Sequence, residues 1–486
     1  MKYGNVLSGK EKETETEGKE QEDLPMQEFY PLTAAQKMHH NWIMKYKTQQ
    51  VSGVSVVASL KSPIDFGLFK KCIQLELERY GCMRVRFTKP DKNGEVKQYI
   101  VKKDSRDIPV KDLSGMSMQE ADNLMQQWAY ETFDGDDIPM CDITMLKLPE
   151  GFNGFFIHMD HRLIDSCGLV IMINDIMQLY THYRFNSAYP EDLADFEKVL
   201  VNDLKKANNE KRFAKDKKFW DDQLDALGEP LYSDIKGSSV LEEARKRHGN
   251  KKLRAADIEL ENLFVDVKDY HLEPEPTKNL LDFCMNHQLS MTNLLLLGIR
   301  TYLSKANNGQ EDITIQNFIS RRSTHDEWTS GGSRTIMFPC RTVIPLETDF
   351  MSAAYEIQNV QNKIYMHSNY DPALIEEEMR KRYKTPENTT YESCYLTYQP
   401  MPVKMENPHL VDIPQHSKWF ANGAATKKMY LTVSHTEDGG MNFSYHYQTA
   451  CLEEHDMELL YYYMMRILFK GIAEPDMSIG ELMEQV

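Results

Sequence analysis

The alternation of strand-like and helix-like segments on both sides of a charged stretch is the feature that most constrains the fold. Residues 54–60 are rich in valine and partly alternating, which predicts a strand. Residues 190–252 are charged and mainly helical in pattern, so we interpret them as a connection between two halves. After this connection the mixture of helices and strands resumes. The pattern predicts an α/β (α+β) protein with two lobes of related architecture.

In the first half, helix and strand patterns follow one another closely. Thr33 is a suitable N-cap for a helix through Trp42, and Asp65 is a suitable N-cap for a helix through Leu77. The segment after Asp165 is apolar around most of its surface, which predicts a buried helix. The other expected elements are strands at 83–87, 143–148 and 154–159 and a helix at 116–133.

The second half shows the same mixture of patterns. Ser290 or Thr292 can cap a helix over residues 294–303. The remaining expected elements are an amphipathic helix at 353–366, a final helix at 455–469, and strands at 313–319, 335–344, 395–399, 430–434 and 441–447.

Composition argues against several classes of function. The net charge of −17 argues against a nucleic-acid surface, which needs a basic stripe. The eight cysteines form no CxxC pair, which argues against a zinc site and a disulfide framework. There is no apolar signal core and no run of about 18 apolar residues, so we expect a cytoplasmic protein without membrane contact. Residues 1–25, rich in Lys and Glu, are expected to be a disordered tail.

His161 and Asp165 form an HxxxD segment between an expected strand and the buried helix. A strand-to-helix turn places side chains at the mouth of a sheet, where active sites concentrate. A histidine of near-neutral pKa can accept a proton from an amine or hydroxyl that attacks a thioester carbonyl. Asp165 is either the N-cap of the helix or the partner of an arginine that fixes the turn. Neither role makes Asp165 a proton acceptor.

Three nearby or similar residues have simpler interpretations. A second HxxxD segment, at His367, follows an amphipathic helix and is interpreted as a helix exit. His158 lies three residues before His161, a spacing that points strand side chains to opposite faces, so no metal site is expected there. Cys167 has no evident activating partner and is interpreted as a structural thiol.

Residues 159–166 resemble the HHxxxDG signature of the condensation domains of nonribosomal peptide synthetases and of related chloramphenicol-acetyltransferase-like enzymes. Other motifs of this family are matched in the expected order. They are residues 30–36 with PLSxAQ, residues 79–87 with RHxxLRxxF, the pair Phe219 and Trp220, residues 320–322 followed by 331–332 and 337–338, residues 367–372 with HQDxP, and the strand at 395–399.

The resemblance covers residues 29 to about 470 and implies a fold and site residues. It implies two chloramphenicol-acetyltransferase-like lobes in a V, with the active site in a tunnel between them. The expected divisions are a tail at 1–25, an N-terminal lobe at 26–195 and a C-terminal lobe at 196–486. By resemblance His161 is catalytic, and Asp165 is structural and pairs with an arginine. The candidate partners are Arg321, Arg322 and Arg84.

Two positions depart from the family signature. Asp160 stands where the family has its first histidine, and Ser166 stands where it has glycine. Related alcohol acyltransferases keep only HxxxD, so the first departure is compatible with the superfamily. The side chain of Ser166 is expected to narrow the donor channel. The late DFGWG motif of plant-type acyltransferases is absent, which disfavours that branch.

The resemblance implies an acyltransferase that joins a thioester-bound acyl or aminoacyl group to an amine or hydroxyl, forming an amide or ester. No bound cofactor is expected. The donor would be a thioester of phosphopantetheine on an acyl or peptidyl carrier protein, acting in trans because no carrier segment fits in this chain, or a thioester of coenzyme A. The acceptor would be a small-molecule amine or alcohol. The alternative is a non-catalytic condensation-like module that recruits a carrier-bearing enzyme.

Overall fold

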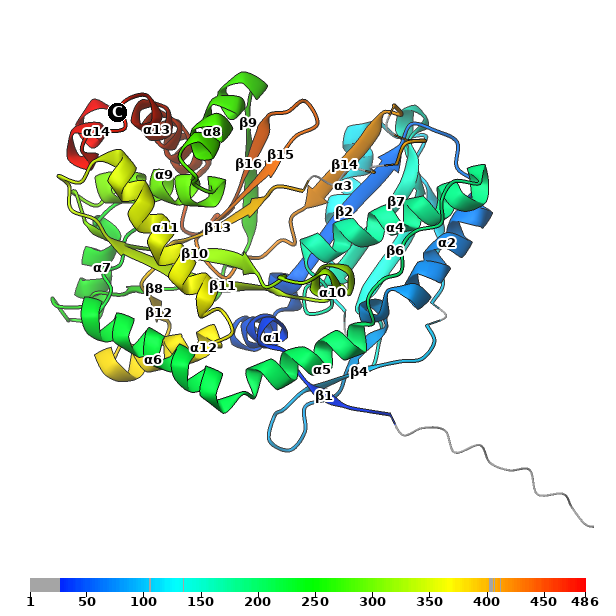
Figure 1. Ribbon diagram of the computed structural model, residues 1–486, viewed down its shortest axis with the longest axis horizontal. Coiled ribbons are helices and arrows are strands. Elements are labelled where there is room, and N and C mark those ends of the chain that lie inside the picture. Colours follow the sequence, from blue (N-terminus) through cyan, green and yellow to red (C-terminus); the bar gives the residue numbers. More distant parts are fainter. Residues whose placement is uncertain (1–26, 105, 134, 402–404, 406, 411) are drawn as a thin grey trace, which may run out of the picture.

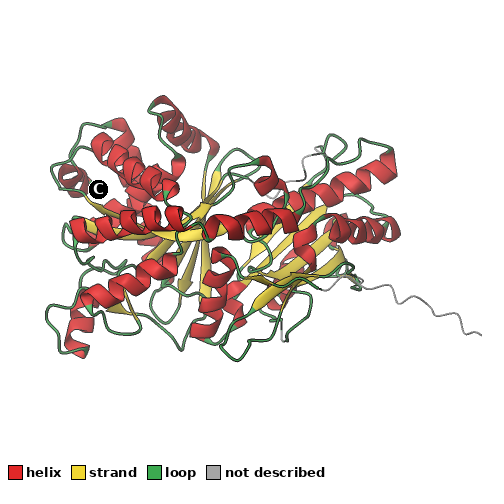
Figure 2. Cartoon of the chain, turned by 60° about the horizontal axis from the view of Figure 1, so that its bottom comes forward, coloured by secondary structure: helices red, strands yellow, loops and turns green. Residues whose placement is uncertain are grey.

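Two β-sheets, each packed against helices, organise the protein (Figure 1). The computed structural model describes residues 27–486 except 105, 134, 402–404, 406 and 411. The body built on the five-stranded sheet is called the first lobe, and the body built on the six-stranded sheet is called the second lobe. The expected tail at residues 1–25 lies outside the described residues. Helices lie mainly on the outside and strands in the interior (Figure 2).

The sheet of the first lobe has the strand order β14-β2-β7-β6-β5. Helices α2 and α4 pack on one face and build the larger core, while α3 covers the other face through Ala121 and Met125. Both faces of the central strands are therefore apolar. The elements are β2 (Gly53–Leu60), α2 (Phe66–Arg79), β5 (Val110–Asp112), α3 (Met118–Trp128), β6 (Cys141–Lys147), β7 (Asn153–Asp160), α4 (Ser166–Phe185) and β14 (Gln415–Phe420).

The sheet of the second lobe has the strand order β11-β10-β13-β15-β16-β9. Its helices cover one face only. On β15, Leu431 and Val433 point into that core, whereas Thr432 and Ser434 point to the opposite face. The elements are β9 (Val265–Leu272), α8 (Pro274–Asn286), α9 (Met291–Ala306), β10 (Asp312–Ser320), β11 (Thr335–Val343), α11 (Phe350–Met366), β13 (Cys394–Gln399), β15 (Met429–His435), β16 (Met441–Gln448), α13 (Glu454–Ala473) and α14 (Ile479–Gln485).

The charged connection forms helices that run along one side of the molecule from the first lobe to the second (Figure 1). They are α5 (Phe196–Ala207) and α6 (Glu210–Leu227). The Trp220 ring on α6 stacks on the Phe338 ring of β11, with 5.6 Å between centroids. This contact docks the connection onto the second lobe.

The remaining elements are short or lie between the lobes. Helix α1 contacts β11 of the second lobe, and its Ala34 and Met38 pack against the core of that lobe. These elements are β1 (Tyr30–Pro31), α1 (Ala34–Tyr46), η1 (Gln49–Ser52), η2 (Gly81–Arg84), β3 (Val85–Phe87), β4 (Lys97–Ile100), η3 (Pro149–Gly151), α7 (Ser239–Arg247), β8 (Ala256–Asp257), α10 (His325–Thr329), α12 (Pro372–Tyr383) and β12 (Thr389–Thr390).

Strand β14 crosses from the second half of the chain into the first lobe. Its residues pair with β2 in antiparallel register, from Gln415 opposite Leu60 to Phe420 opposite Ser55. The expected assignment of all residues in 196–486 to the C-terminal lobe is therefore wrong for this strand. The cause is non-local, because the pairing brings together segments that are more than 350 residues apart.

Local sequence signals correctly predicted where several helices start. Thr33 forms a capping box with Gln36, Asp65 accepts a hydrogen bond from the Leu68 amide, and Ser290 rather than Thr292 caps α9. The longer elements that were not expected are β9, α8, α12 and β14, and several short ones, such as β4, β5 and α14, were not expected either. Among the described residues, no helix has both the length and the apolar character needed to cross a membrane.

The close approach of β7 to β2 generates a stability prediction. A Cβ on Gly154 would lie 2.1 Å from the Ala58 carbonyl oxygen, and that backbone cannot move aside without breaking the sheet. Gly154→Ala should lower the free energy of unfolding by about 1–3 kcal/mol or more. Gly115→Ala is the matched control, since nothing lies within 4 Å of its added Cβ. Urea unfolding curves that coincide for the two variants would contradict this packing.

Candidate active site

A cavity of about 760 Å³ lies between the two lobes. The first lobe contributes the turn at His161 and the start of α4 at Ser166, and α1 contributes His39. The second lobe contributes the polar face of its sheet, including Thr397, Gln399, Thr432, Ser434, Ser444 and His446. The cavity therefore has one wall from each sheet and places the HxxxD turn on the wall of the first lobe.

The turn between β7 and α4 is held by backbone and apolar contacts. The His161 amide donates to the Ser52 carbonyl at 2.6 Å, and the Leu163 amide donates to the Asp160 carbonyl at 2.9 Å. The side chains of Leu163 and Ile164 are buried in the core of the first lobe. These contacts fix the backbone from which His161 reaches the cavity.

Asp165 is both a helix N-cap and the partner of a buried arginine. One carboxylate oxygen accepts from the Gly168 amide at 3.1 Å, and the two oxygens accept from Nη1 and Nη2 of Arg322 at 2.8 Å each. The Arg334 and Thr335 amides add bonds at 2.9 and 3.0 Å. Burial would raise the pKa of Asp165, but the charge and hydrogen bonds of Arg322 outweigh it and hold that pKa well below its ordinary value.

The other two candidate arginines do not reach Asp165. Arg84 donates to the carbonyls of Leu77 and Val101, at 3.0 and 3.1 Å, so it closes the end of α2. Arg321 donates to Asn369 Oδ1 at 3.0 Å. Of the three candidate partners, Arg322 is therefore the one that pairs with Asp165, because the side chains of Arg84 and Arg321 bind elsewhere.

The loop that follows Arg322 presses closely on the first lobe. Gly331 and Gly332 both have positive φ, at 73° and 83°. A Cβ on Gly331 would lie 2.6 Å from the Tyr80 ring, and a Cβ on Gly332 would lie 2.7 Å from the Phe196 ring. Only glycine fits both the backbone conformation and the available space here.

Asp160 forms a buried ion pair with Arg162 two residues later. Its oxygens accept from the Arg162 amide at 2.8 Å, from Nε at 3.0 Å and from Nη2 at 2.9 Å. Gln49 adds a bond at 2.8 Å, and the Arg162 guanidinium lies over the Phe87 ring at 4.7 Å. The departure at residue 160 therefore replaces a family histidine with a carboxylate whose charge Arg162 balances.

Ser166 is the first residue of α4 and lines the cavity. Its hydroxyl oxygen accepts a hydrogen bond from Gln399 Nε2 at 3.1 Å. Because Gln399 lies on β13, this bond joins the two cavity walls beside the HxxxD turn. The hydroxyl and its partner occupy space that a glycine at this position would leave open.

Among the described residues, the His161 ring has no hydrogen-bond partner on any other residue. Its Nδ1 is buried, so Nε2 is the nitrogen left for a ligand in the cavity. The ring stacks on the His39 ring, with 4.3 Å between centroids and 14° between planes. Burial lowers the pKa of His161, while the charge of Asp165, the backbone of His161 itself and the charge of Asp160 oppose this shift without overcoming it. The ring is therefore neutral at neutral pH and able to accept a proton.

The other singled-out residues have structural contacts. His158 Nδ1 lies 2.8 Å from Ser55 Oγ and its Nε2 lies 2.9 Å from the Glu131 carbonyl, away from a metal-binding geometry with His161. His367 pairs with Asp216 of α6 at 2.8 Å, so the second HxxxD segment also anchors the connection. Burial raises the pKa of the Cys167 thiol, which keeps it protonated.

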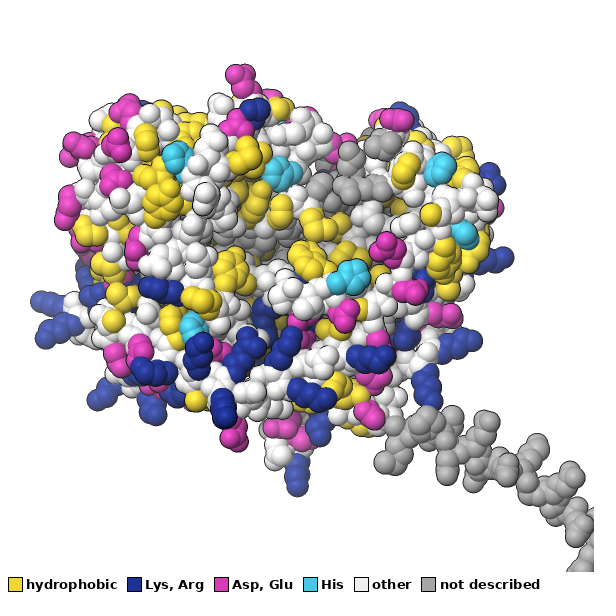
Figure 3. Space-filling model, in the orientation of Figure 1, with side chains coloured by type: hydrophobic (Ala, Val, Ile, Leu, Met, Phe, Trp, Pro, Cys, Tyr) yellow, Lys and Arg dark blue, Asp and Glu magenta, His cyan; other side chains and the backbone are white. Residues whose placement is uncertain are grey.

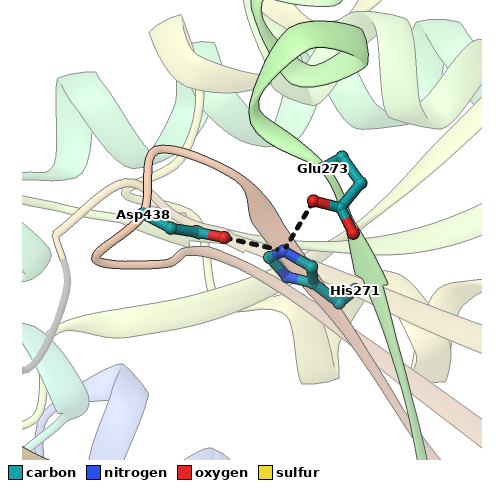
Figure 4. Close-up of side chains that lie close together, drawn as sticks. All are labelled: His271, Glu273 and Asp438. Atoms are coloured by element: carbon teal, nitrogen blue, oxygen red, sulfur yellow. Dashed lines mark ion pairs between the residues drawn. The ribbon is translucent and has the colours of Figure 1, made fainter.

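In the described part of the chain, one group of three side chains of the types that bind metal ions lies close together: His271, Glu273 and Asp438 (Figure 4). All three are exposed. His271 Nε2 lies 2.9 Å from Asp438 Oδ2, and Asp438 also accepts from the Gly440 amide at 3.0 Å. These contacts close the β15–β16 hairpin against the end of β9.

His39 is the residue at this site that sequence reasoning missed. The segment after Thr33 predicted a helix, and nothing in it placed the helix against the HxxxD turn. The adjacent pair His39 and His40 in this helix was the available signal.

Comparison with known proteins gives one consistent family. A model of the condensation domain matches residues 26–484. Surfactin synthase subunit 1 of Bacillus subtilis (strain 168) is 24% identical over 464 residues, which cover 93% of this chain and 12% of that protein. Tyrocidine synthase 3 of Brevibacillus parabrevis is 25% identical over 193 residues, which cover 40% of this chain and 3% of that protein. The chain thus spans only a small part of the length of these relatives.

Solved structures show the same fold at low sequence identity. The first condensation domain of the calcium-dependent antibiotic synthetase, with substrate analogue 2a, has a TM-score of 0.74 at 15% identity and covers 93% of this chain and 99% of that chain. VibH, a condensation enzyme, has a TM-score of 0.70 at 15% identity, and the match covers 92% of this chain and 99% of that chain. A variant of the starter condensation domain of rhizomide synthetase RzmA, with C8-CoA, has a TM-score of 0.75 at 15% identity. The match covers 93% of this chain and 96% of that chain.

The buried pair at the turn predicts an unequal cost of removing two N-cap aspartates. Asp165→Ala leaves Arg322 buried without a counter-charge and should lower the free energy of unfolding by about 3–5 kcal/mol. Asp65→Ala removes only a cap and should cost about 1 kcal/mol. Chemical denaturation of both variants measures the difference.

The pH dependence gives a second check on the same pair. Because the folded-state pKa of Asp165 is lowered, its stabilisation is complete above the ordinary aspartate range and is lost as the pH falls below it. The gap between wild type and Asp165→Ala should therefore shrink in acid. Equal, small losses of unfolding free energy in Asp165→Ala and Asp65→Ala at neutral pH would contradict the pairing of Asp165 with Arg322.

Proposed function

The chain belongs to the condensation-domain family, whose members are typically acyltransferases, and on this basis we propose that it transfers a thioester-bound acyl or aminoacyl group to an amine or hydroxyl. The observation that carries the proposal is the His161 ring on the wall of the cavity between the lobes, where no other described residue forms a hydrogen bond with its side chain. Asp165 and Arg322 hold the turn and take no part in proton transfer.

In the proposed reaction, His161 Nε2 accepts the proton of the acceptor as its nitrogen or oxygen attacks the thioester carbonyl carbon. A carbon–nitrogen or carbon–oxygen bond forms and the carbon–sulfur bond breaks. The departing thiolate takes the proton back from His161 and leaves as a thiol. The ring is neutral before and after each cycle, so no further acid or base is needed.

The donor in this proposal is a thioester of phosphopantetheine, carried by a separate acyl or peptidyl carrier protein or present in coenzyme A. The cavity volume of about 760 Å³ is within the range of pockets that hold such ligands. The acceptor is a small amine or alcohol, and the hydroxyls of Thr432, Ser434 and Ser444 offer it polar contacts.

Basic side chains gather on one edge of a protein whose net charge is −17. Figure 3 shows Lys and Arg along the lower edge of the molecule, over α5 and α6. Helix α6 carries Lys211, Arg212 and Lys215 in its first two turns. This edge supports the proposed encounter with a carrier protein, whose phosphopantetheine arm brings a phosphate and whose surface is commonly acidic.

The proposal is tested with acyl-loaded carrier proteins and acyl-coenzyme A, each offered a panel of amines and alcohols. Mass spectrometry should detect an amide or ester that forms only with the protein present. Turnover with coenzyme A thioesters but no carrier would assign the protein to small-molecule acyl transfer. Carrier binding with no product from any acceptor would favour the non-catalytic binding module. The departures from the family signature at Asp160 and Ser166 are the reason to consider this alternative.

Replacing the proposed base gives a direct prediction. His161→Ala should reduce transfer by about two to four orders of magnitude, the usual contribution of a general base, and should leave the unfolding midpoint nearly unchanged. His367→Ala is the control from the second HxxxD segment, and where it folds it should transfer within a few fold of wild type. Steady-state rates of both purified variants decide the role. A normally folded His161→Ala with the wild-type rate would exclude His161 as the base.

The hydrogen bond between Ser166 and Gln399 predicts a change in donor preference. Ser166→Gly removes the hydroxyl that joins the cavity walls, so long or bulky acyl donors should react several-fold faster, with a lower KM. Ser166→Thr adds a methyl group at the same point and should act in the opposite direction. Initial rates over a series of acyl chain lengths provide the measurement. Identical chain-length profiles for wild type and both variants would show that residue 166 does not limit the donor.

A further inference from the structure

His39 is a buried histidine whose contacts have no role in the mechanism above. It lies on α1, is 3% exposed and lines the cavity. Neither of its ring nitrogens has a hydrogen-bond partner in the part of the chain that the structure describes. A histidine buried in this way loses its hydration without replacement, which is a cost that a leucine would avoid. Its ring contacts are a stack on His161 at 4.3 Å and an edge contact with Trp42 at 4.9 Å.

The His161 ring needs an orienting contact, and neither an acid nor the carbonyl of another described residue supplies one. A general base is ordinarily held by a hydrogen bond from its second nitrogen to another group, yet the buried Nδ1 of His161 has only the backbone of its own residue nearby. The two nearest carboxylates are already committed, Asp165 to Arg322 and Asp160 to Arg162. What remains is the stack with His39, whose ring also makes an edge contact with Trp42.

We propose that His39 is the positioning residue for His161: its ring fixes the plane of the His161 ring, and the stacked pair accepts no more than one proton. This inference rests on the proposed function, because it gives His161 the role of base. His39 acts through His161 and is not itself given a bond to the acceptor. It thus supplies the orienting contact that a carboxylate supplies in other histidine-based sites.

The charges around the pair agree with a single-proton site. Burial and then the charge of His161 lower the pKa of His39, Arg162 lowers it further, and Asp165 opposes the shift. Burial also lowers the pKa of the adjacent His40, which faces Arg162 and Asp160. Two stacked imidazolium rings would repel strongly in such a dry site, so a proton on one ring keeps the other neutral.

The test uses the full-length protein with histidine labelled at ¹³Cε1, and compares His39→Leu, His39→Phe and the control His40→Leu. Phenylalanine keeps a flat ring beside His161, whereas leucine removes it. His40 is half-buried and makes no ring contact with His161, so it is the matched neighbour. NMR titration of the His161 signal needs no substrate, and kcat and KM are then measured with any donor that the wild type accepts.

In His39→Leu the His161 signal should lose its stacking shift and titrate differently from wild type, while His40→Leu leaves it unchanged. His39→Leu should reduce kcat by about ten- to a hundredfold with KM nearly constant, as expected for a misplaced base. His39→Phe should stay within about threefold of wild-type kcat. A His161 signal and kcat that His39→Leu leaves unaltered would overturn the proposal, and so would a folded His39→Phe as slow as His39→Leu.

The two proposals fail in different ways. If wild type transfers nothing but His161 responds to His39→Leu as described, the ring pair is supported and the proposed function is contradicted. If transfer depends on His161 but neither readout depends on His39, the proposed function stands and the positioning role is overturned.

Discussion

The bidentate pair of Asp165 and Arg322 is the interaction on which the site depends. The two residues are 157 positions apart and come from different lobes, and their side chains are 1% and 0% exposed. A buried pair of this kind is better tolerated when more of its remaining hydrogen-bonding positions are filled. Here the amides of Gly168, Arg334 and Thr335 fill those of the carboxylate. The turn of the first lobe and the loop of the second are therefore held in one arrangement.

Other contacts extend this junction into the rest of the molecule. Arg334 donates its backbone amide to Asp165 and its guanidinium to Asp203 of α5, at 2.7 Å, so the connection is tied to the same point. Strand β14, which lines the cavity, carries the second half of the chain into the first sheet. The lobes are thus joined at Asp165, through this crossover strand and through the bond between Ser166 and Gln399, and the cavity lies between them.

Sequence predicted those features whose causes are local. Thr33, Asp65 and Asp165 are helix caps because their side chains bond to amides three residues later, and such spacing is visible in the chain. The choice of Arg322 over Arg321 was not visible, since adjacent arginines look alike until the second lobe is placed. Strand β14 was missed because its residues 415–418 are polar and line the cavity, which removes the apolar alternation of a half-buried strand. Its pairing with β2 is set by tertiary structure alone.

The departure at residue 160 bears on how the site handles a proton. Asp160 and Asp165 both lie beside His161, but each is bound to an arginine, so neither offers the imidazolium a hydrogen bond. Burial then lowers the pKa of His161 against the weaker effect of the two negative charges. A lowered pKa means that the imidazolium form of His161 is weakly stabilised. In the proposed transfer this favours passing the proton on to the departing thiolate, because a stable imidazolium would slow that step. The arginine pairs thus fix the turn and leave the proposed orientation of His161 to its stacked neighbour, His39.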